Sequence, residues 1–230
     1  MNALFLASIV WVGGLLSLPS PVWAQVEPPE ARALPPTIPI FPLQDVALFP
    51  NTSVPLHIFE PRYRAMIADA LEGDGIIGMV LLQPGHEADY HGRPPVHAIG
   101  CAGEITDAEE LPDGRYLILL RGLVKFRVMS EDRSRTYRLA VVESLPEVLD
   151  ESAREVLSLR RRQLAAMLAA QDPDAELLPE SLSDTEFVDR LAQVIRLDPA
   201  ARQSLLELDG FVERADALIG ILAEREAVPL

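Results

Sequence analysis

The apolar residues of this chain change their spacing near Pro146, and this change constrains the fold more than any other feature. Over residues 37–148 they occur in short runs separated by Pro, Gly and Asp, which is typical of β-strands. After Pro146 they recur every three to four residues, which is typical of amphipathic helices. We therefore expect a strand-rich part over 37–148 and a helical part over 149–230, the organisation of an α+β protein.

The strand-rich part is predicted to be an antiparallel meander. Its apolar runs are residues 38–41, 46–49, 54–59, 76–82, 96–105, 116–120, 124–129 and 137–142. In the turn Pro112-Asp113-Gly114 the proline presets φ and the glycine accepts a positive φ, so residues 98–110 and 115–120 should pair as a hairpin. So many short strands in about a hundred residues favour closure into a small barrel.

The clearest signals for helices are the residues that should begin and end them. Glu60-Pro61 should begin one helix inside the strand-rich part, and Gly73 should end it. Beyond Pro146 we expect a helix over about 150–171, in which the arginines at 160–162 mostly face solvent and pair with nearby acidic residues. Three further helices should follow. The first begins at a capping box over 183–186, the second begins at the dipeptide Asp198-Pro199, and Gly210 separates the second from the third. These stripes predict a small bundle.

The first residues resemble an export signal. Residues 4–18 are almost entirely apolar. In the tripeptide Val22-Trp23-Ala24, small or aliphatic residues occupy the two positions that a signal peptidase recognises before its cleavage site. A run of about 15 residues is short of the roughly 20 that span a bilayer. We expect a signal peptide over 1–24, cleaved between Ala24 and Gln25, then a flexible leader over 25–36. The mature chain would be periplasmic or secreted, without a stable membrane span; retention of the segment as an N-terminal anchor is the alternative.

Charge and lysine content exclude several activities. The net charge of −15 opposes binding to nucleic acid, because phosphate recognition depends on Lys and Arg. Only Lys125 is a lysine, and it lies in an alternating strand pattern rather than in a phosphate-binding loop. We expect its side chain to face solvent. The chain then lacks the lysine that a P-loop ATPase or a Ser-Lys peptidase requires, so both activities are excluded. No catalytic residue is assigned.

Metal and thiol chemistry have weak support. Cys101 lies in an apolar run and should be a small buried residue, since one cysteine makes neither a disulfide nor a thiolate zinc site. His57 should point outward from a strand. The loop from His86 to His97 carries the possible ligands His86, Glu87, Asp89, His91 and His97. Their spacing matches no rigid template, so a solvated loop without metal or other cofactor is favoured.

Several segments resemble one protein family. Residues 40–50 read Ile-Phe-Pro-Leu-Gln-Asp-Val-Ala-Leu-Phe-Pro, and residues 54–64 read Val-Pro-Leu-His-Ile-Phe-Glu-Pro-Arg-Tyr-Arg. Together they resemble the opening of the Lon N-terminal domain, the substrate-binding domain of Lon-type proteases. Residues 113–128 resemble the central hairpin of that family, and Leu205-Leu-Glu-Leu-Asp with Glu213-Arg214 resembles its closing helices. The matches keep the family's order over about residues 36–225.

The resemblance implies both a fold and a function. The fold is a small antiparallel PUA-like β pseudo-barrel followed by a C-terminal helical bundle. The implied function is recognition of unfolded or extended polypeptide, or of a protein partner, by a stand-alone member without ATPase or peptidase domains. The alternative is a hydrolase or metal-dependent enzyme that uses the His86–His97 loop.

The resemblance also suggests where polypeptide binds. Motif positions that match the family are Pro42, Leu43, Pro50, Pro55, Phe59, Glu60, Arg62 and Tyr63. A scaffold role is favoured for each of them, with Phe59 and Tyr63 packing the helix onto the barrel. A barrel this small buries one side of each strand, so the strands over 38–59 and the helix that follows should leave an apolar groove. The candidate peptide-binding residues are Leu43, Phe49, Phe59, Glu60, Arg62 and Tyr63.

Overall fold

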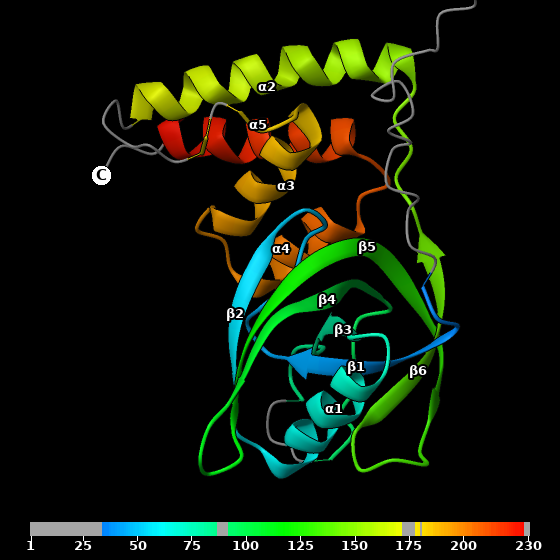
Figure 1. Ribbon diagram of the computed structural model, residues 1–230. Coiled ribbons are helices and arrows are strands. Elements are labelled where there is room, and N and C mark those ends of the chain that lie inside the picture. Colours follow the sequence, from blue (N-terminus) through cyan, green and yellow to red (C-terminus); the bar gives the residue numbers. More distant parts are fainter. Residues whose placement is uncertain (1–33, 87–91, 172–177, 180, 228–230) are drawn as a thin grey trace, which may run out of the picture. The chain divides into compact units, whose positions relative to one another are not determined.

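The protein is described by a computed structural model that covers residues 34–86, 92–171, 178–179 and 181–227 (Figure 1). The described residues, from Leu34 onward, form one compact unit. The expected signal peptide, its cleavage site and most of the expected leader lie outside the described residues, as do Glu87, Asp89 and His91. None of the helices in the described ranges is long and apolar enough to cross a membrane.

Six strands form one sheet in the order β2-β5-β4-β3-β1-β6. The strands are β1 (Thr37–Leu43), β2 (Ser53–Ile58), β3 (Ile76–Leu81), β4 (Ile99–Glu110), β5 (Tyr116–Asp132) and β6 (Arg138–Leu145). The sheet closes because β5 is long enough to pair with β6 as well as with β2 and β4. The predicted α+β fold with a β pseudo-barrel is therefore confirmed, with β2 added at one edge.

The connectivity differs from the expected meander. The described sheet has six strands rather than eight, because the runs at 116–120 and 124–129 are parts of β5 and residues 46–49 form no strand. Gln193 holds that segment instead: its side chain donates to the Ala47 carbonyl at 3.0 Å and accepts from the Phe49 amide at 3.1 Å. In addition, β1 and β3 are parallel, since the helix between β2 and β3 carries the chain across the barrel.

The expected hairpin and the first helix are confirmed. Glu110 of β4 lies opposite Tyr116 of β5, and Gly114 in the turn has φ 78°. The helix α1 (Pro61–Glu72) begins with proline after Glu60 and ends at Gly73. Its buried residues include Tyr63, whose ring centroid lies 4.5 Å from that of Phe41. Figure 1 shows α1 against the concave side of the curved sheet.

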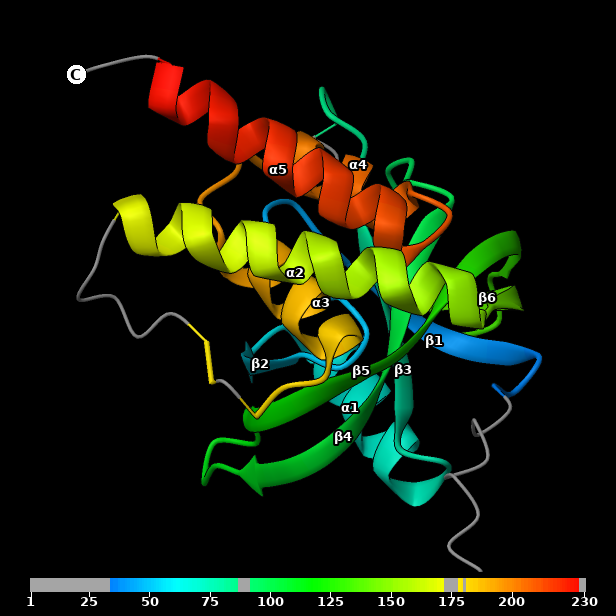
Figure 2. The same ribbon diagram turned by 90° about the horizontal axis from the view of Figure 1, so that it is seen from above.

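Four helices follow the barrel and pack on one another, as predicted (Figure 2). They are α2 (Glu151–Gln171), α3 (Asp184–Val194), α4 (Pro199–Glu207) and α5 (Phe211–Ala227). Ser183 and Glu186 form the predicted capping box of α3, and Asp198 caps α4. One apolar core continues from the barrel into the bundle, so the two parts are stabilised together.

Two predictions about charged residues were wrong. Lys125 is buried rather than exposed to solvent: its Nζ lies 2.9 Å from Glu147 and donates to the Leu208 carbonyl. The ion pairs that the structure describes for Arg160 and Arg161 join α2 to other helices rather than to the acidic residues near its own start. Arg160 pairs with Asp216 of α5, and Arg161 pairs at 3.0 Å with Asp184 at the start of α3. The partners of Lys125 come from the connection between β6 and α2 and from the residue after α4, and those of the arginines come from α5 and α3, so local spacing cannot indicate them.

Candidate functional site

An exposed apolar surface lies on the outer face of β2 and β5. Phe59 is 60% exposed, Leu117 is 43% exposed and Leu119 is 38% exposed. Pro55, also exposed, lies opposite Leu119 in the β2–β5 register. We call Pro55, Phe59, Leu117 and Leu119 the apolar strip. Apolar side chains gathered at a solvent-exposed face are typical of a binding surface.

The alternation of the two strands produces this surface. Val54 and Ile58 on β2, and Ile118 and Leu120 on β5, face inward and are buried. The side chains between them must therefore face outward, because successive residues of a strand point to opposite sides of the sheet. The core of the barrel thus fixes which residues form the apolar strip.

The backbone of β2 offers a second binding feature. In the described part of the chain β2 pairs with β5 alone. The Gly122 amide donates to the Thr52 carbonyl at 2.8 Å. Alternation from this bond directs the backbone groups of Val54, Leu56 and Ile58 toward β5 and those of Ser53, Pro55 and His57 toward the outer edge. Pro55 has no N–H to offer there, which suits an edge strand and limits association between copies of the chain.

Acidic side chains border the apolar strip on β4. Asp107 lies opposite Leu119, and Glu109 lies opposite Leu117. Both carboxylates are exposed, and neither forms an ion pair with a residue that the structure describes. The border therefore favours positively charged groups beside an apolar ligand.

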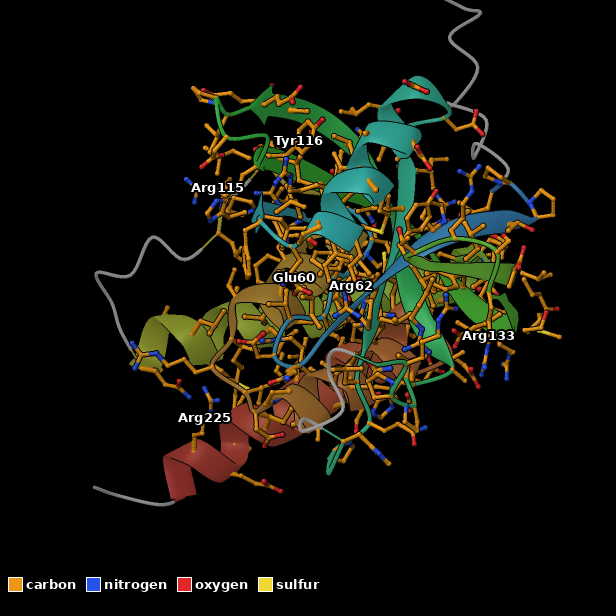
Figure 3. The ribbon with its side chains drawn as sticks, turned by 90° about the horizontal axis from the view of Figure 1, so that it is seen from below. Glu60, Arg62, Arg115, Tyr116, Arg133 and Arg225 are labelled. Atoms are coloured by element: carbon orange, nitrogen blue, oxygen red, sulfur yellow. The ribbon has the colours of Figure 1, made fainter. Side chains whose placement is uncertain are left out.

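A polar cluster marks the turn end of the strip. The Nε of Arg115 lies 2.7 Å from Asp113, and its Nη1 lies 3.1 Å from His57 Nε2. The His57 and Phe59 ring centroids are 5.8 Å apart. His57 faces outward as predicted, and its contacts orient it beside the strip rather than beside a nucleophile. In Figure 3, seen from below, Arg115 and Tyr116 are labelled near each other, to one side of Glu60 and Arg62.

The candidate peptide-binding residues occupy different environments. Phe59 is on the surface, so the expectation that it packs the helix onto the barrel was wrong. Phe49 and Tyr63 are buried in the core. Phe49 is not accessible to a ligand, whereas Tyr63, 3% exposed, lines a cavity beside α1. Leu43 is half-buried against the same core. The candidates therefore do not form one continuous surface, and Phe59 alone belongs to the apolar strip.

Glu60 and Arg62 lie beside Phe59 but are engaged with one another. The Nε of Arg62 donates to Glu60 at 3.1 Å, and its guanidinium lies 4.5 Å from the centroid of the Tyr63 ring. This pair lies at the start of α1, which begins at Pro61. Binding of polypeptide by these two residues stays a prediction.

Sequence reasoning did not select Leu117 and Leu119. The signal was present in residues 116–120, Tyr-Leu-Ile-Leu-Leu, which are apolar on both sides of the strand. Since a small barrel buries one side, such a run leaves apolar side chains on the other. The predicted hairpin, together with the rule that a strand apolar on both sides leaves one apolar side exposed, is sufficient to indicate this part of the apolar strip.

The other candidate chemistries receive no support from the described residues. Burial raises the pKa of the Cys101 thiol well above its usual range, which keeps it protonated. His97 Nδ1 lies 3.1 Å from Glu207 on α4. No group of three or more His, Cys, Asp or Glu residues suited to a metal ion occurs within the described ranges.

Comparisons with known proteins agree with this architecture. The model of the ATP-dependent protease La (LON) substrate-binding domain family matches residues 37–224. Lon protease of Trichlorobacter lovleyi is 27% identical over 203 residues, which are 84% of this chain and 24% of that protein. Lon protease 1 of Syntrophobacter fumaroxidans is 29% identical over 192 residues, which are 80% of this chain and 23% of that protein. The chain thus spans about a quarter of the length of the curated relatives it matches.

Two solved structures share the fold. The N-terminal domain of the Mycobacterium avium complex Lon protease has a TM-score of 0.63 at 18% identity, covering 82% of this chain and 98% of that one. The Lon N-terminal domain protein from Xanthomonas campestris has a TM-score of 0.58 at 24% identity, covering 80% of this chain and 97% of that one. These two matches, at this identity, establish likeness of fold.

Proposed function

The chain belongs to the LON substrate-binding domain family, and on this premise we propose that it binds unfolded or extended polypeptide without catalysing a reaction. The observation that carries the proposal is the apolar strip beside the outer edge of β2. An extended chain can contact the strip with alternate side chains and the edge with its backbone. A folded protein has few such segments available, because its apolar side chains and strand edges are mostly covered.

Binding should be weak and partly electrostatic. A disordered ligand loses conformational entropy when it becomes ordered, which holds the affinity near the micromolar range, about 10⁻⁶ M. Asp107 and Glu109 beside the strip should add a preference for basic sequences. This preference should fade as salt is added, because exposed charges are screened over roughly 8 Å at physiological ionic strength.

The test is a titration with a reduced, fluorescently labelled unfolded protein. We expect the domain to bind it and Phe59→Ala to weaken binding severalfold. Met129→Ala is the matched control, since Met129 is 59% exposed on the distal part of β5, outside the strip. Circular dichroism establishes that both variants are folded. Absence of binding to the wild type refutes the proposed function, and equal weakening by both variants refutes the strip as its site.

We further propose that the chain neither hydrolyses ATP nor cleaves polypeptide. The sequence offers no P-loop, and Lys125 is its only lysine. The burial of Lys125 against Glu147 supports a structural role for this residue. Casein cleavage and ATP turnover should both stay at background, and activity that disappears in Lys125→Ala would refute this proposal.

We propose in addition that the chain acts in the cell envelope. The support is the apolar segment 4–18 and the cleavage motif that ends at Ala24. Mass spectrometry of the native protein should find Gln25, or its cyclised form, at the N-terminus. Recovery of chains that keep residues 1–24 in the membrane fraction supports the uncleaved anchor instead.

A further inference from the structure

A cavity of about 380 Å³ between α1 and the β5–β6 turn is lined by four arginines. They are Arg62, Arg93, Arg133 and Arg138. The volume lies in the range of small-molecule sites, about 300–1,000 Å³. Such a concentration of guanidinium groups is unexpected in a chain of net charge −15, so the cavity calls for a physical explanation.

Two of these arginines are paired with carboxylates. Arg62 donates to Glu60 at 3.1 Å. Arg138 is buried and donates its Nε to Glu131 at 2.8 Å and its Nη1 to the Pro94 carbonyl at 2.7 Å. Their charges are balanced, and their positions are fixed.

The other two arginines bring positive charge without a carboxylate among the described residues. Arg93 donates to three backbone carbonyls of the turn, those of Asp132, Arg135 and Tyr137, at 3.0–3.3 Å. Carbonyl groups orient a guanidinium but do not neutralise it. The side chain of Arg133 is exposed at the cavity and pairs with no residue that the structure describes. Within the described residues, the four arginines of the cavity wall thus outnumber the carboxylates that pair with them by two.

We propose that this cavity binds a carboxylate of the polypeptide ligand. A planar guanidinium matches a carboxylate in shape and charge, with paired N–H donors. Nucleic acid is disfavoured, because its many phosphates would meet the acidic surface around a single cavity. At physiological ionic strength the distant acidic residues are screened, so the nearby arginines decide the local potential.

The position of the cavity joins it to the apolar strip. Phe59 of the strip directly precedes Glu60, which pairs with Arg62 in the cavity wall. In Figure 3 Arg62 lies between Tyr116, next to the strip, and Arg133 on the other side. A chain that ends in the cavity would place its preceding residues on Phe59. The inference rests on the proposed function and adds a direction to the bound chain, with its carboxylate end at the arginines.

The test compares two labelled, unstructured peptides of the same apolar and basic sequence, one ending in a free carboxylate and one in an amide. We expect the wild-type protein to bind the free acid about tenfold more tightly, since hydrogen bonds to charged groups contribute about that much. A third peptide, amidated but ending in Asp, distinguishes a side-chain carboxylate from a chain end. Recovery of tight binding by this peptide assigns the cavity to carboxylates in general, whereas its failure assigns it to chain ends.

Two variants locate the effect. Arg133→Gln should lower the preference for the free acid from about tenfold to about threefold, if the two surplus charges contribute equally. Arg225→Gln removes the same charge from the far end of α5 and should keep the full preference (Figure 3). If the wild type binds the acid and the amide equally well, the cavity does not bind a carboxylate, and the proposed function still stands. An unchanged preference in Arg133→Gln also overturns the carboxylate site, and failure to bind either peptide overturns both proposals.

Discussion

Arg214 on α5 donates to Asp189 on α3 over 2.6 Å, and both side chains are completely buried. Asp189 also accepts from Asn51, which precedes β2, at 3.0 Å. Arg214 reaches Glu147 at 2.7 Å, and Glu147 pairs with Lys125 of β5. The buried network therefore joins the barrel to the helical bundle, and through Asn51 it fixes the start of the strand that carries part of the apolar strip.

Removal of Asp189 should be strongly destabilising. Burial raises the pKa of this carboxyl to about 7, although Arg214 and the Asn51 hydrogen bond act in the opposite direction. At about pH 8 Asp189 is therefore mostly ionised. Asp189→Ala leaves Arg214 with one fewer buried partner, which should cost about 3 kcal/mol in free energy of unfolding.

The control for that measurement is Asp216→Ala. Asp216 pairs with Arg160 at the surface, and its removal should cost less than about 1 kcal/mol. Urea denaturation of both variants measures the difference. If both variants lose a similar amount of free energy of unfolding, the buried ion pair of Asp189 contributes no more to stability than the surface pair of Asp216.

Local signals in the sequence were sufficient for much of the fold. The Pro112-Asp113-Gly114 turn, the Glu60-Pro61 helix start and the Ser183 capping box each depend on neighbouring residues, and all three are present. The apolar strip could have been recognised in part from residues 116–120, since one side of that strand had to remain exposed.

Long-range partners were the features that local patterns could not supply. The strand pattern placed Lys125 away from the barrel interior, where Phe126 is buried. It could not show that Glu147 and Leu208 cover Lys125. The arginine-lined cavity likewise combines α1 with residues near 93 and 133, which no spacing along the chain connects.

Two glycines should respond to alanine in opposite directions. A Cβ at Gly100 would lie 2.3 Å from the Met79 carbonyl oxygen, where backbone cannot easily move, whereas a Cβ at Gly220 meets nothing within 4 Å. Gly100→Ala should lose about 3 kcal/mol through overpacking. Gly220→Ala should gain about 0.8 kcal/mol from the higher helix propensity of alanine. Thermal unfolding measures both, and loss of stability in Gly220→Ala would contradict its placement on an open helix face.

Tyr137 should make stability depend on alkaline pH. Burial, together with a hydrogen bond donated to Asp69 at 2.6 Å, raises the pKa of this phenol to about 12. The folded protein thus holds the proton more tightly than the unfolded chain, whose tyrosines titrate near pH 10. The contribution of Tyr137 is complete below about pH 10 and is lost as the pH rises through about 12.

Tyr137→Phe should remove this contribution. Absorbance of tyrosinate should lose its highest-pH phase in the variant, and the free energy of unfolding should fall less steeply between about pH 10 and 12. At neutral pH the free energy of unfolding of the variant should be about 1 kcal/mol lower, because the hydrogen bond to Asp69 is missing. An unchanged absorbance titration would mean that Tyr137 is not the tyrosine of raised pKa.

Hydrogen exchange with and without an unfolded polypeptide tests the binding surface most directly. If the ligand occupies the apolar strip and the outer edge of β2, backbone amides over residues 53–59 and 115–121 should exchange more slowly in its presence. Amides of α2 and α5, which lie in the bundle, should be unaffected. Protection confined to the bundle, with residues 53–59 exchanging as they do in the free protein, would contradict the account.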